Sequence, residues 1–244
     1  MTALAAAAVF LGASLQSATG FGFALIAAPI MFAAFGPHEA VTAGVLLGAE
    51  ISLLTLVTEG RVPRVLRGEA VVLVAWSLPG LALGALALRE LPERLLSAFV
   101  AIGVLGGLAL RLRARGARSA GAPVRSRRWS APLAGVCSGA LSTSTALNGP
   151  PIVLHLLARG ASSEQMRDTL AAVFVALAVL SAPALAITGT FAVPAAVAAL
   201  LAAGLAGQLV GRRLFARLAG ERYESVVLIV LALAALIALA TSVV

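Results

Sequence analysis

The segment 142-STSTALNGPP-151 interrupts a long apolar stretch that extends from about residue 130 to about residue 158. Proline lacks a backbone N–H and its ring clashes with the preceding helical turn, so the Pro150-Pro151 pair cannot lie inside a continuous helix. A second overlong apolar stretch, about 2–36, is interrupted near its middle by 17-SATGFG-22. Each stretch therefore contains a break, and these two breaks decide how the chain can be folded.

The composition is that of an integral membrane protein. Hydrophobic residues make up 61% of the 244 residues, charged residues 11%, and the mean hydropathy is +1.04. A soluble domain of this size would need far more polar surface, and the apolar runs recur at roughly the 18–25 residues that a helix needs to cross a bilayer. The net charge of +8 comes from arginines between the apolar runs. We interpret it as a topological signal, and we expect no nucleic-acid partner.

The chain divides into two halves of similar plan. Residues 113–129 form a basic linker that separates a first repeat, 1–112, from a second repeat, 130–244. Each repeat opens with an interrupted stretch and continues with three ordinary spans, as in transporters that contain internal repeats. The predicted spans are 39–58, 68–88 and 94–112 in the first repeat, and 166–188, 191–215 and 222–243 in the second.

An interrupted stretch can cross the membrane once as a broken helix, or it can enter and return as a re-entrant hairpin. If both stretches are hairpins, sixteen arginines lie on one side of the membrane and only Arg89 and Arg94 on the other. If the second stretch crosses, the division becomes ten against eight. Cytoplasmic loops carry an excess of arginine, which favours a hairpin for the second stretch and a cytoplasmic linker. The first stretch is assigned a hairpin by its correspondence with the second.

An odd number of spans follows each hairpin, so the second repeat is inverted relative to the first. We therefore expect an all-α, polytopic membrane protein of two inverted repeats, each with one re-entrant helical hairpin and three transmembrane helices. Both chain termini are expected outside. The two hairpin tips, which are the turns between half-helices, are expected to meet near the middle of the bilayer.

The tips are the candidate substrate site. Irregular backbone at membrane depth is tolerated only where protein or a water-filled cavity satisfies its polar groups. A half-helix that begins at a tip directs free N–H groups and the positive end of its dipole into that cavity, which suits an anion. The alternative is that these small residues only let helices pack closely in lipid. The candidate substrate-binding residues are Ser17, Thr19, Gly20, Gly22, Ser142, Thr143, Ser144, Thr145, Asn148 and Gly149.

Two titratable residues inside apolar segments are candidates for ion coupling. Glu50 lies well inside the 39–58 span, where an ionised carboxylate is costly and usually functional. It is either the carrier of a coupling proton or a hydrogen-bonded packing residue. His155 follows the second tip by about one turn, and it is either a coupling residue or a buried histidine with satisfied hydrogen bonds. Gln16 and Gln208 are weaker candidates.

The segments Gly20-Phe21-Gly22-Phe23 and Asn148-Gly149-Pro150-Pro151, the basic linker, and Arg167-Asp168-Thr169-Leu170 resemble the TauE/SafE family. Its members are bacterial membrane proteins regarded as exporters of sulfite and small organosulfonates. The resemblance covers essentially the whole chain. It implies an anion carrier of the bacterial inner membrane, coupled to protons or driven by the membrane potential. Its partners would be a small anion, membrane lipid and protons, and a homodimer stays open.

The leading hypothesis is a secondary transporter that exports a small anion, sulfite or a small organosulfonate, through a site between the two tips. The alternatives are a passive small-anion channel and a transporter of another small oxyanion or carboxylate. The sequence contains no Walker-type glycine loop for ATP hydrolysis. Its two histidines and one cysteine fit no metal-binding motif and no obvious catalytic triad. We therefore expect no enzymatic activity, no metal and no cofactor.

Overall fold

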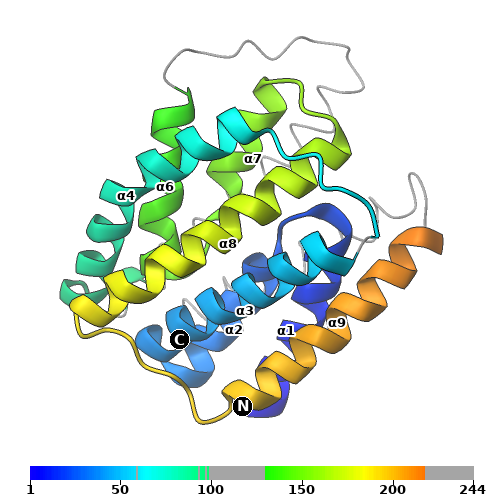
Figure 1. The fold of residues 1–244 in the computed structure, drawn as a ribbon. Helices are drawn as coiled ribbons and strands as arrows, with labels where there is room; N and C mark the ends of the chain where they lie inside the picture. The colour runs from blue at the N-terminus through cyan, green and yellow to red at the C-terminus, as the bar shows by residue number, and fades with distance from the viewer. Residues whose placement is uncertain (59, 93, 97, 99–129, 218–244) are drawn as a thin grey trace.

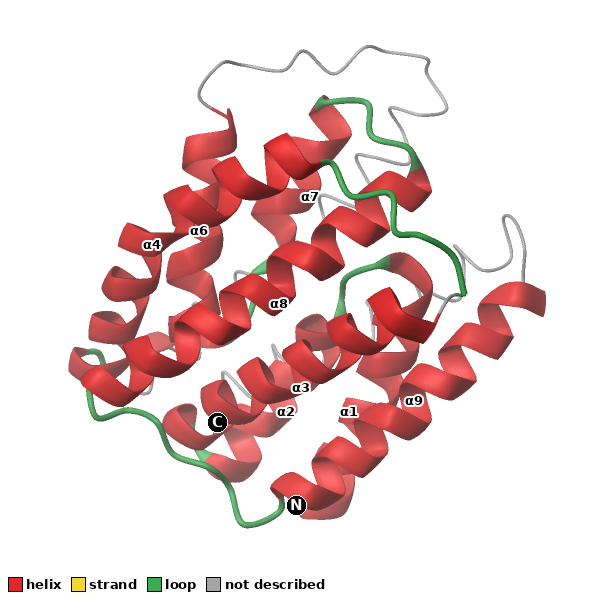
Figure 2. Cartoon of the chain, in the orientation of Figure 1, coloured by secondary structure: helices red, strands yellow, loops and turns green. Residues whose placement is uncertain are grey.

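The chain folds into a bundle of helices (Figure 1). The structure is a computed structural model, and it describes residues 1–58, 60–92, 94–96, 98 and 130–217. Within these ranges all regular secondary structure is helical, and loops connect the helices (Figure 2). The helices are α1 (Thr2–Thr19), α2 (Phe23–Phe35), α3 (Pro37–Thr58), α4 (Arg67–Glu90), α6 (Ser130–Thr145), α7 (Gly149–Ala158), α8 (Ser163–Ile187) and α9 (Val197–Arg217).

The predicted all-helical fold is confirmed in the described residues. In the described part of the chain, three segments are long and apolar enough to cross a membrane, namely Pro37–Thr58, Arg67–Glu90 and Glu164–Ile187. They coincide with three of the predicted spans, and α9 coincides with a fourth. The linker and the predicted last span lie outside the described residues, as does nearly all of the span predicted at 94–112.

Both predicted helix breaks are present. α1 ends at Gly20, with a φ of 82°, and α2 begins after Gly22, with a φ of 111°. Glycine adopts this left-handed backbone without steric cost, which explains the glycines at the first break. At the second break, α6 ends at Thr145 and Ala146 takes a φ of 59°. This left-handed conformation costs a residue with a Cβ about 1–2 kcal/mol. The second break is therefore strained at Ala146, whereas the first break is relaxed at Gly20.

The helix boundaries of the first half recur in the second half. The same number of residues separates the ends of α1 and α6, at Thr19 and Thr145, and the starts of α2 and α7, at Phe23 and Gly149. The starts of α3 and α8 are separated by that number too. The residues that directly follow α1 and α6 are both left-handed. The two halves therefore share one plan of helices and breaks.

The halves pack against each other through α4 on α6 and α9 on α1 (Figure 1). Both contacts depend on glycine. A Cβ at Gly80 or Gly139 would collide with a backbone carbonyl of the facing helix in the α4–α6 pair. A Cβ at Gly207 or Gly211 would do the same in the α9–α1 pair. Apolar residues gain little free energy by moving from lipid into a helix contact, because lipid tails are equally apolar. Such close backbone packing is therefore a main source of helix association in a membrane.

A hydroxyl group completes each of these contacts beside a break. Thr143 Oγ1 of α6 donates to the carbonyl oxygen of Leu81 at 2.8 Å. Ser17 Oγ of α1 donates to the carbonyl oxygen of Gln208 at 3.1 Å. The two bonds occupy equivalent places in the two halves. They hold the last turns of α1 and α6 against the neighbouring helices.

α3 and α8 pack side by side and run in opposite directions (Figure 1). Near the start of α3, Thr42 Oγ1 accepts the N–H of Ala192, which follows α8. Near the start of α8, the buried carboxylate of Asp168 accepts two bonds from Arg61, at 2.7 and 3.0 Å, and the N–H of Arg64 at 2.6 Å. Each helix is thus tied near its N-terminus to the segment that follows the other helix.

Gly139→Ala should destabilise the protein. The added methyl group would collide with the carbonyl oxygen of Ser77 and force α4 and α6 apart. Overpacking of this kind costs about 1–3 kcal/mol, so the Tm of the purified protein should fall by several degrees. Gly68→Ala is the control, because no described atom lies within 4 Å of a Cβ there. Equal Tm values for Gly139→Ala and the wild type would contradict the importance of this contact.

Candidate functional site

A cavity lies where the two breaks meet. Its walls come from the α1–α2 break, the α6–α7 break, and the middle of α3 and α8. The space open to the centres of water molecules is about 30 Å³. One water needs roughly 10–15 Å³ by the same measure, so the cavity has room for water or a small polar ligand.

Equivalent positions of the two halves line this cavity. Gln16 and Ser142 occupy the same position in their halves, and so do Gly22 and Asn148. One lining residue of α3 and one of α8 also correspond. A ligand in the cavity would therefore contact both halves of the molecule at once.

Four of the ten predicted binding residues line the cavity, namely Gly22, Ser142, Asn148 and Gly149. Asn148 directly precedes α7, and its carbonyl oxygen accepts Ser138 Oγ at 2.6 Å, which anchors the backbone of the break. The hydroxyl oxygen of Ser142 lies 3.1 Å from that of Ser181, so the two groups share a hydrogen bond. The second break thus contributes two polar residues, Asn148 and Ser142, to the cavity wall.

The other six predicted residues are not part of this lining, and the structure gives them different contacts. They are Ser17, Thr19, Gly20, Thr143, Ser144 and Thr145. Two of them donate to backbone carbonyls of α9 and α4, and three donate to a carbonyl one turn back in their own helix. Gly20 packs against Arg167, whose Cα would lie 2.9 Å from a Cβ at Gly20. In the structure these six residues shape the breaks.

Sequence reasoning underrated one lining residue. Gln16 is only a weaker candidate by sequence, yet it lines the cavity, is 5% exposed, and donates from Nε2 to Ser52 Oγ at 3.3 Å. Its spacing before Gly22 equals that of Ser142 before Asn148, and this repeat spacing is the signal that identifies it. The lining residues of α3 and α8 are far from the breaks in the sequence, and only tertiary packing brings these helices to the breaks.

The cavity surface is neutral and offers hydrogen-bond donors. None of the described residues that line it is charged. The first residues of α2 line it, and the N-cap residue Gly22 makes no side-chain cap, so the first amides of α2 remain available to a ligand or water. α7 contributes fewer amides, because Pro150 and Pro151 lack an N–H. Free amides at a helix N-terminus favour an anion.

The two coupling candidates lie outside the cavity lining. Glu50 faces α9, where its Oε2 would lie 2.9 Å from a Cβ at Gly204, and this buried oxygen has no hydrogen-bond partner among the described residues. His155 is buried, with Nδ1 3.0 Å from Ser130 Oγ and Nε2 2.7 Å from Glu69 Oε2. Its ring nitrogens therefore have partners. The described residues contain no group of three or more His, Cys, Asp or Glu that could hold a metal ion.

Comparison with known proteins identifies the family. The family model described as sulfite exporter TauE/SafE matches residues 4–238, which is nearly the whole chain. No curated protein and no solved structure matches the chain. The family is one of membrane transporters of the sulfite and organosulfonate type, and the apolar helices agree with that. The resemblance seen in the motifs is confirmed, and the chain belongs to the TauE/SafE sulfite exporter family.

Proposed function

We propose that the chain is a secondary transporter that exports a small anion, sulfite or a small organosulfonate, and binds it in the cavity between the two breaks. The observation that carries this proposal is the neutral cavity, lined with donors and built from equivalent positions of the two halves. Hydrogen bonds and helix ends can hold a small anion without a fixed positive charge. Release is then easier than from a site that contains an arginine.

Each break is proposed as the tip of a re-entrant hairpin. α7 has 10 residues, and at 1.5 Å per residue it extends only about 15 Å, half the hydrocarbon thickness of a bilayer. α2, with 13 residues, is also too short to cross. α1 packs against α2, and α6 packs against α7. These contacts support a chain that turns back at each break.

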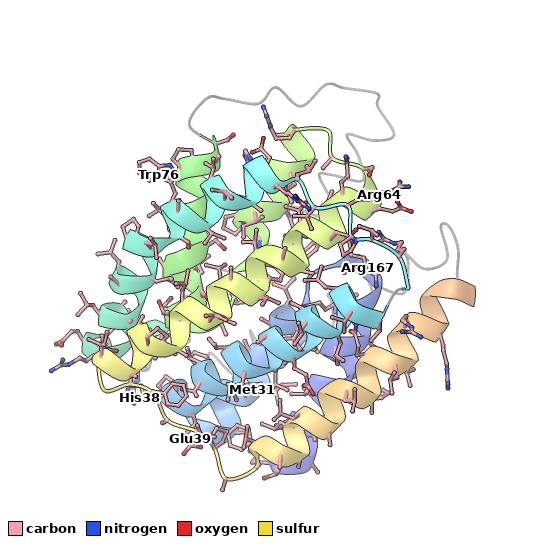
Figure 3. The ribbon with its side chains drawn as sticks, viewed as in Figure 1. Met31, His38, Glu39, Arg64, Trp76 and Arg167 are labelled. Atoms are coloured by element: carbon pink, nitrogen blue, oxygen red, sulfur yellow. The ribbon has the colours of Figure 1, made fainter. Side chains whose placement is uncertain are left out.

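The two halves are proposed as inverted repeats. α3 and α8 hold equivalent places in the two halves and run in opposite directions, as inverted halves require. Figure 3 shows Arg64 and Arg167 toward one end of the bundle, and His38 and Glu39 at the other. We propose that the arginine-bearing end faces the cytoplasm of a bacterial inner membrane and that both chain termini lie outside.

The proposed binding mode uses both halves. The side-chain amide of Asn148 and the hydroxyl group of Ser142 donate to the anion from the second half, and the first amides of α2 donate from the first half. A bound anion then bridges the halves. Movement of one half against the other would open the cavity to one side of the membrane at a time, as in other transporters with inverted repeats.

The proposed topology predicts that single cysteines at Ser119 and Ala161, in a Cys137-free background, both face the cytoplasm. The reason is that a re-entrant second hairpin returns the chain to the side of the basic linker. Labelling with a membrane-impermeant thiol reagent in intact cells and in inverted vesicles measures the side of each position. Labelling of the two positions from opposite sides would exclude the second hairpin.

Asn148→Ala should weaken anion binding more than it lowers the yield of folded protein. Loss of a hydrogen bond to a charged partner is worth roughly 1.5–3 kcal/mol, or about ten- to a hundredfold in affinity. The measurement is sulfite affinity of purified, correctly folded protein. Thr145→Val is the matched control, because the Thr145 hydroxyl donates to Leu141 in its own helix and lies outside the cavity lining. Equal affinities for Asn148→Ala and the control would mean that the anion binds elsewhere.

Counterflow into proteoliposomes identifies the substrate among sulfite, sulfoacetate, thiosulfate, sulfate and small carboxylates. Sulfite or an organosulfonate should exchange across the membrane. Exchange of carboxylates alone would change the substrate class. Flux of anions without any counterflow would indicate a passive channel instead of a carrier.

If Glu50 carries a coupling proton, Glu50→Gln should abolish proton-driven uptake into vesicles and leave substrate exchange largely intact. The amide keeps the size of the side chain but cannot release a proton. Uptake driven by an imposed pH gradient and exchange without a gradient measure the two properties separately. Driven uptake at the wild-type rate would assign Glu50 to packing.

A further inference from the structure

We infer that the interface of α1, α3 and α9 binds a monovalent cation, Na⁺ or a proton taken up by Glu50, beside the anion cavity. Its ligands are Glu50 Oε2 and Gln208 Oε1. This inference builds on the proposed anion carrier, because the cation would be its coupling ion. It nevertheless concerns a separate site, and its test does not require transport.

Gln208 is a buried carboxamide with one unsatisfied atom. Its side chain belongs to a residue that is 2% exposed, and Nε2 donates to Thr55 Oγ1 at 3.0 Å. Its Oε1 is buried and has no hydrogen-bond partner within the described ranges. A buried acceptor without a donor is unfavourable, and in a native structure it calls for a partner such as a bound ion or water.

A second unsatisfied oxygen lies on the same interface. Glu50 Oε2 is buried without a hydrogen-bond partner in the described part of the chain, and it faces Gly204 of α9. Gln208 follows Gly204 by four residues, so it lies on the same face of α9 one turn further along. The Gln208 carboxamide donates to Thr55 Oγ1 of α3, five residues beyond Glu50. Both oxygens therefore lie in the same region between α3 and α9.

The other half of the molecule provides an internal comparison. The carbonyl oxygen of Gln208 accepts the hydroxyl group of Ser17 in α1, and the carbonyl oxygen of Leu81 accepts that of Thr143 in α6. Leu81 is therefore the position equivalent to Gln208. The position equivalent to Glu50, by the interval between α3 and α8, is Ala176. The α4–α8 side thus carries apolar side chains at both places. The fold packs without polar groups there, so packing does not explain Glu50 and Gln208.

This interface is connected to the anion cavity through Gln16. Gln16 lines the cavity and donates to Ser52 Oγ, a residue that is 1% exposed. Ser52 lies one turn before Thr55, which accepts the carboxamide of Gln208. A row of buried carboxamides and hydroxyls therefore leads from the cavity to the two unsatisfied oxygens. A cation there would attract a bound anion through a medium of low dielectric constant, so each ion would favour binding of the other.

The ligand atoms define the class of ion. Hard cations prefer oxygen ligands, and the two unsatisfied atoms are a carboxylate oxygen and an amide oxygen. One carboxylate balances one positive charge, whereas a divalent ion would leave net charge buried in the membrane. Na⁺ would satisfy both oxygens by coordination, and a proton would do so by converting Glu50 to a carboxylic acid that donates to Gln208 Oε1.

The test measures the Tm of the purified full-length protein without an anionic substrate. In one series, NaCl replaces choline chloride at constant ionic strength and alkaline pH, and in the other the pH falls in choline chloride. The Tm of the wild type should rise by about 3–6 °C when the cation reaches about ten times its Kd. A rise with NaCl identifies Na⁺, and a rise only with falling pH identifies a proton.

Gln208→Leu, which introduces the residue found in the other half, should lose this rise. Glu50→Gln keeps the size and should raise the Kd at least about tenfold, because it removes the charge. Ser77→Ala is the control, since this buried serine of α4 donates to Val74 in its own helix. The control should keep the rise. The inference is overturned if both Gln208→Leu and Glu50→Gln keep the rise in Tm. It is also overturned if the Tm of the wild type rises no more than the Tm of Gln208→Leu.

Titration of the same proteins with sulfite separates this inference from the proposed function. A cation-dependent rise in Tm without a sulfite-dependent rise supports the cation site and contradicts the anion carrier. A sulfite-dependent rise without a cation-dependent rise supports the carrier and removes the cation site.

Discussion

Every backbone N–H and C=O group inside a bilayer needs a partner within the protein or in a water-filled cavity. The two helix breaks leave such groups without helical partners, and the surrounding structure satisfies them. Thr19 donates to the carbonyl of Phe21, and Ser138 donates to the carbonyl of Asn148. Ser17 and Thr143 then join the last turns of α1 and α6 to neighbouring helices. The breaks can persist at the membrane depth proposed for them because the bundle covers them, and residues of both breaks line the cavity.

The scaffold is close to symmetric, but its chemistry is not. Helix boundaries, glycine contacts and hydroxyl bonds recur in both halves, whereas the first break contains glycine where the second contains the strained Ala146. The α1–α3–α9 side also carries Glu50 and Gln208 where the α4–α6–α8 side has Ala176 and Leu81. In a transporter with two equivalent halves, the inward-open and outward-open arrangements would have similar free energies. Residue differences between the halves can let a bound ion change which of these two arrangements is favoured.

Ion pairs tie the helices together at the arginine-bearing end of the bundle. Asp168 binds Arg61, and Glu69 bonds to His155 and to Arg159 at 2.7 and 2.6 Å. These pairs connect α7 and α8 to the region around the start of α4. Charges near a helix end reach the interface more easily than charges in the middle of a span. The pairs therefore hold helix ends in place, and the cavity itself contains neutral groups.

The sequence by itself determined the helical membrane architecture and the two breaks. Composition, span length and the missing N–H groups of Pro150-Pro151 are local constraints that hold in any tertiary arrangement. It also associated Asn148 and Ser142 with a break, and both residues line the cavity there. The repeat spacing indicates Gln16 as the counterpart of Ser142, but only the tertiary structure decided that Thr19 and Thr145 lie outside the cavity lining. A hydroxyl group in a helix can donate to its own backbone or to a ligand, and the choice depends on how the helix is rotated against its neighbours.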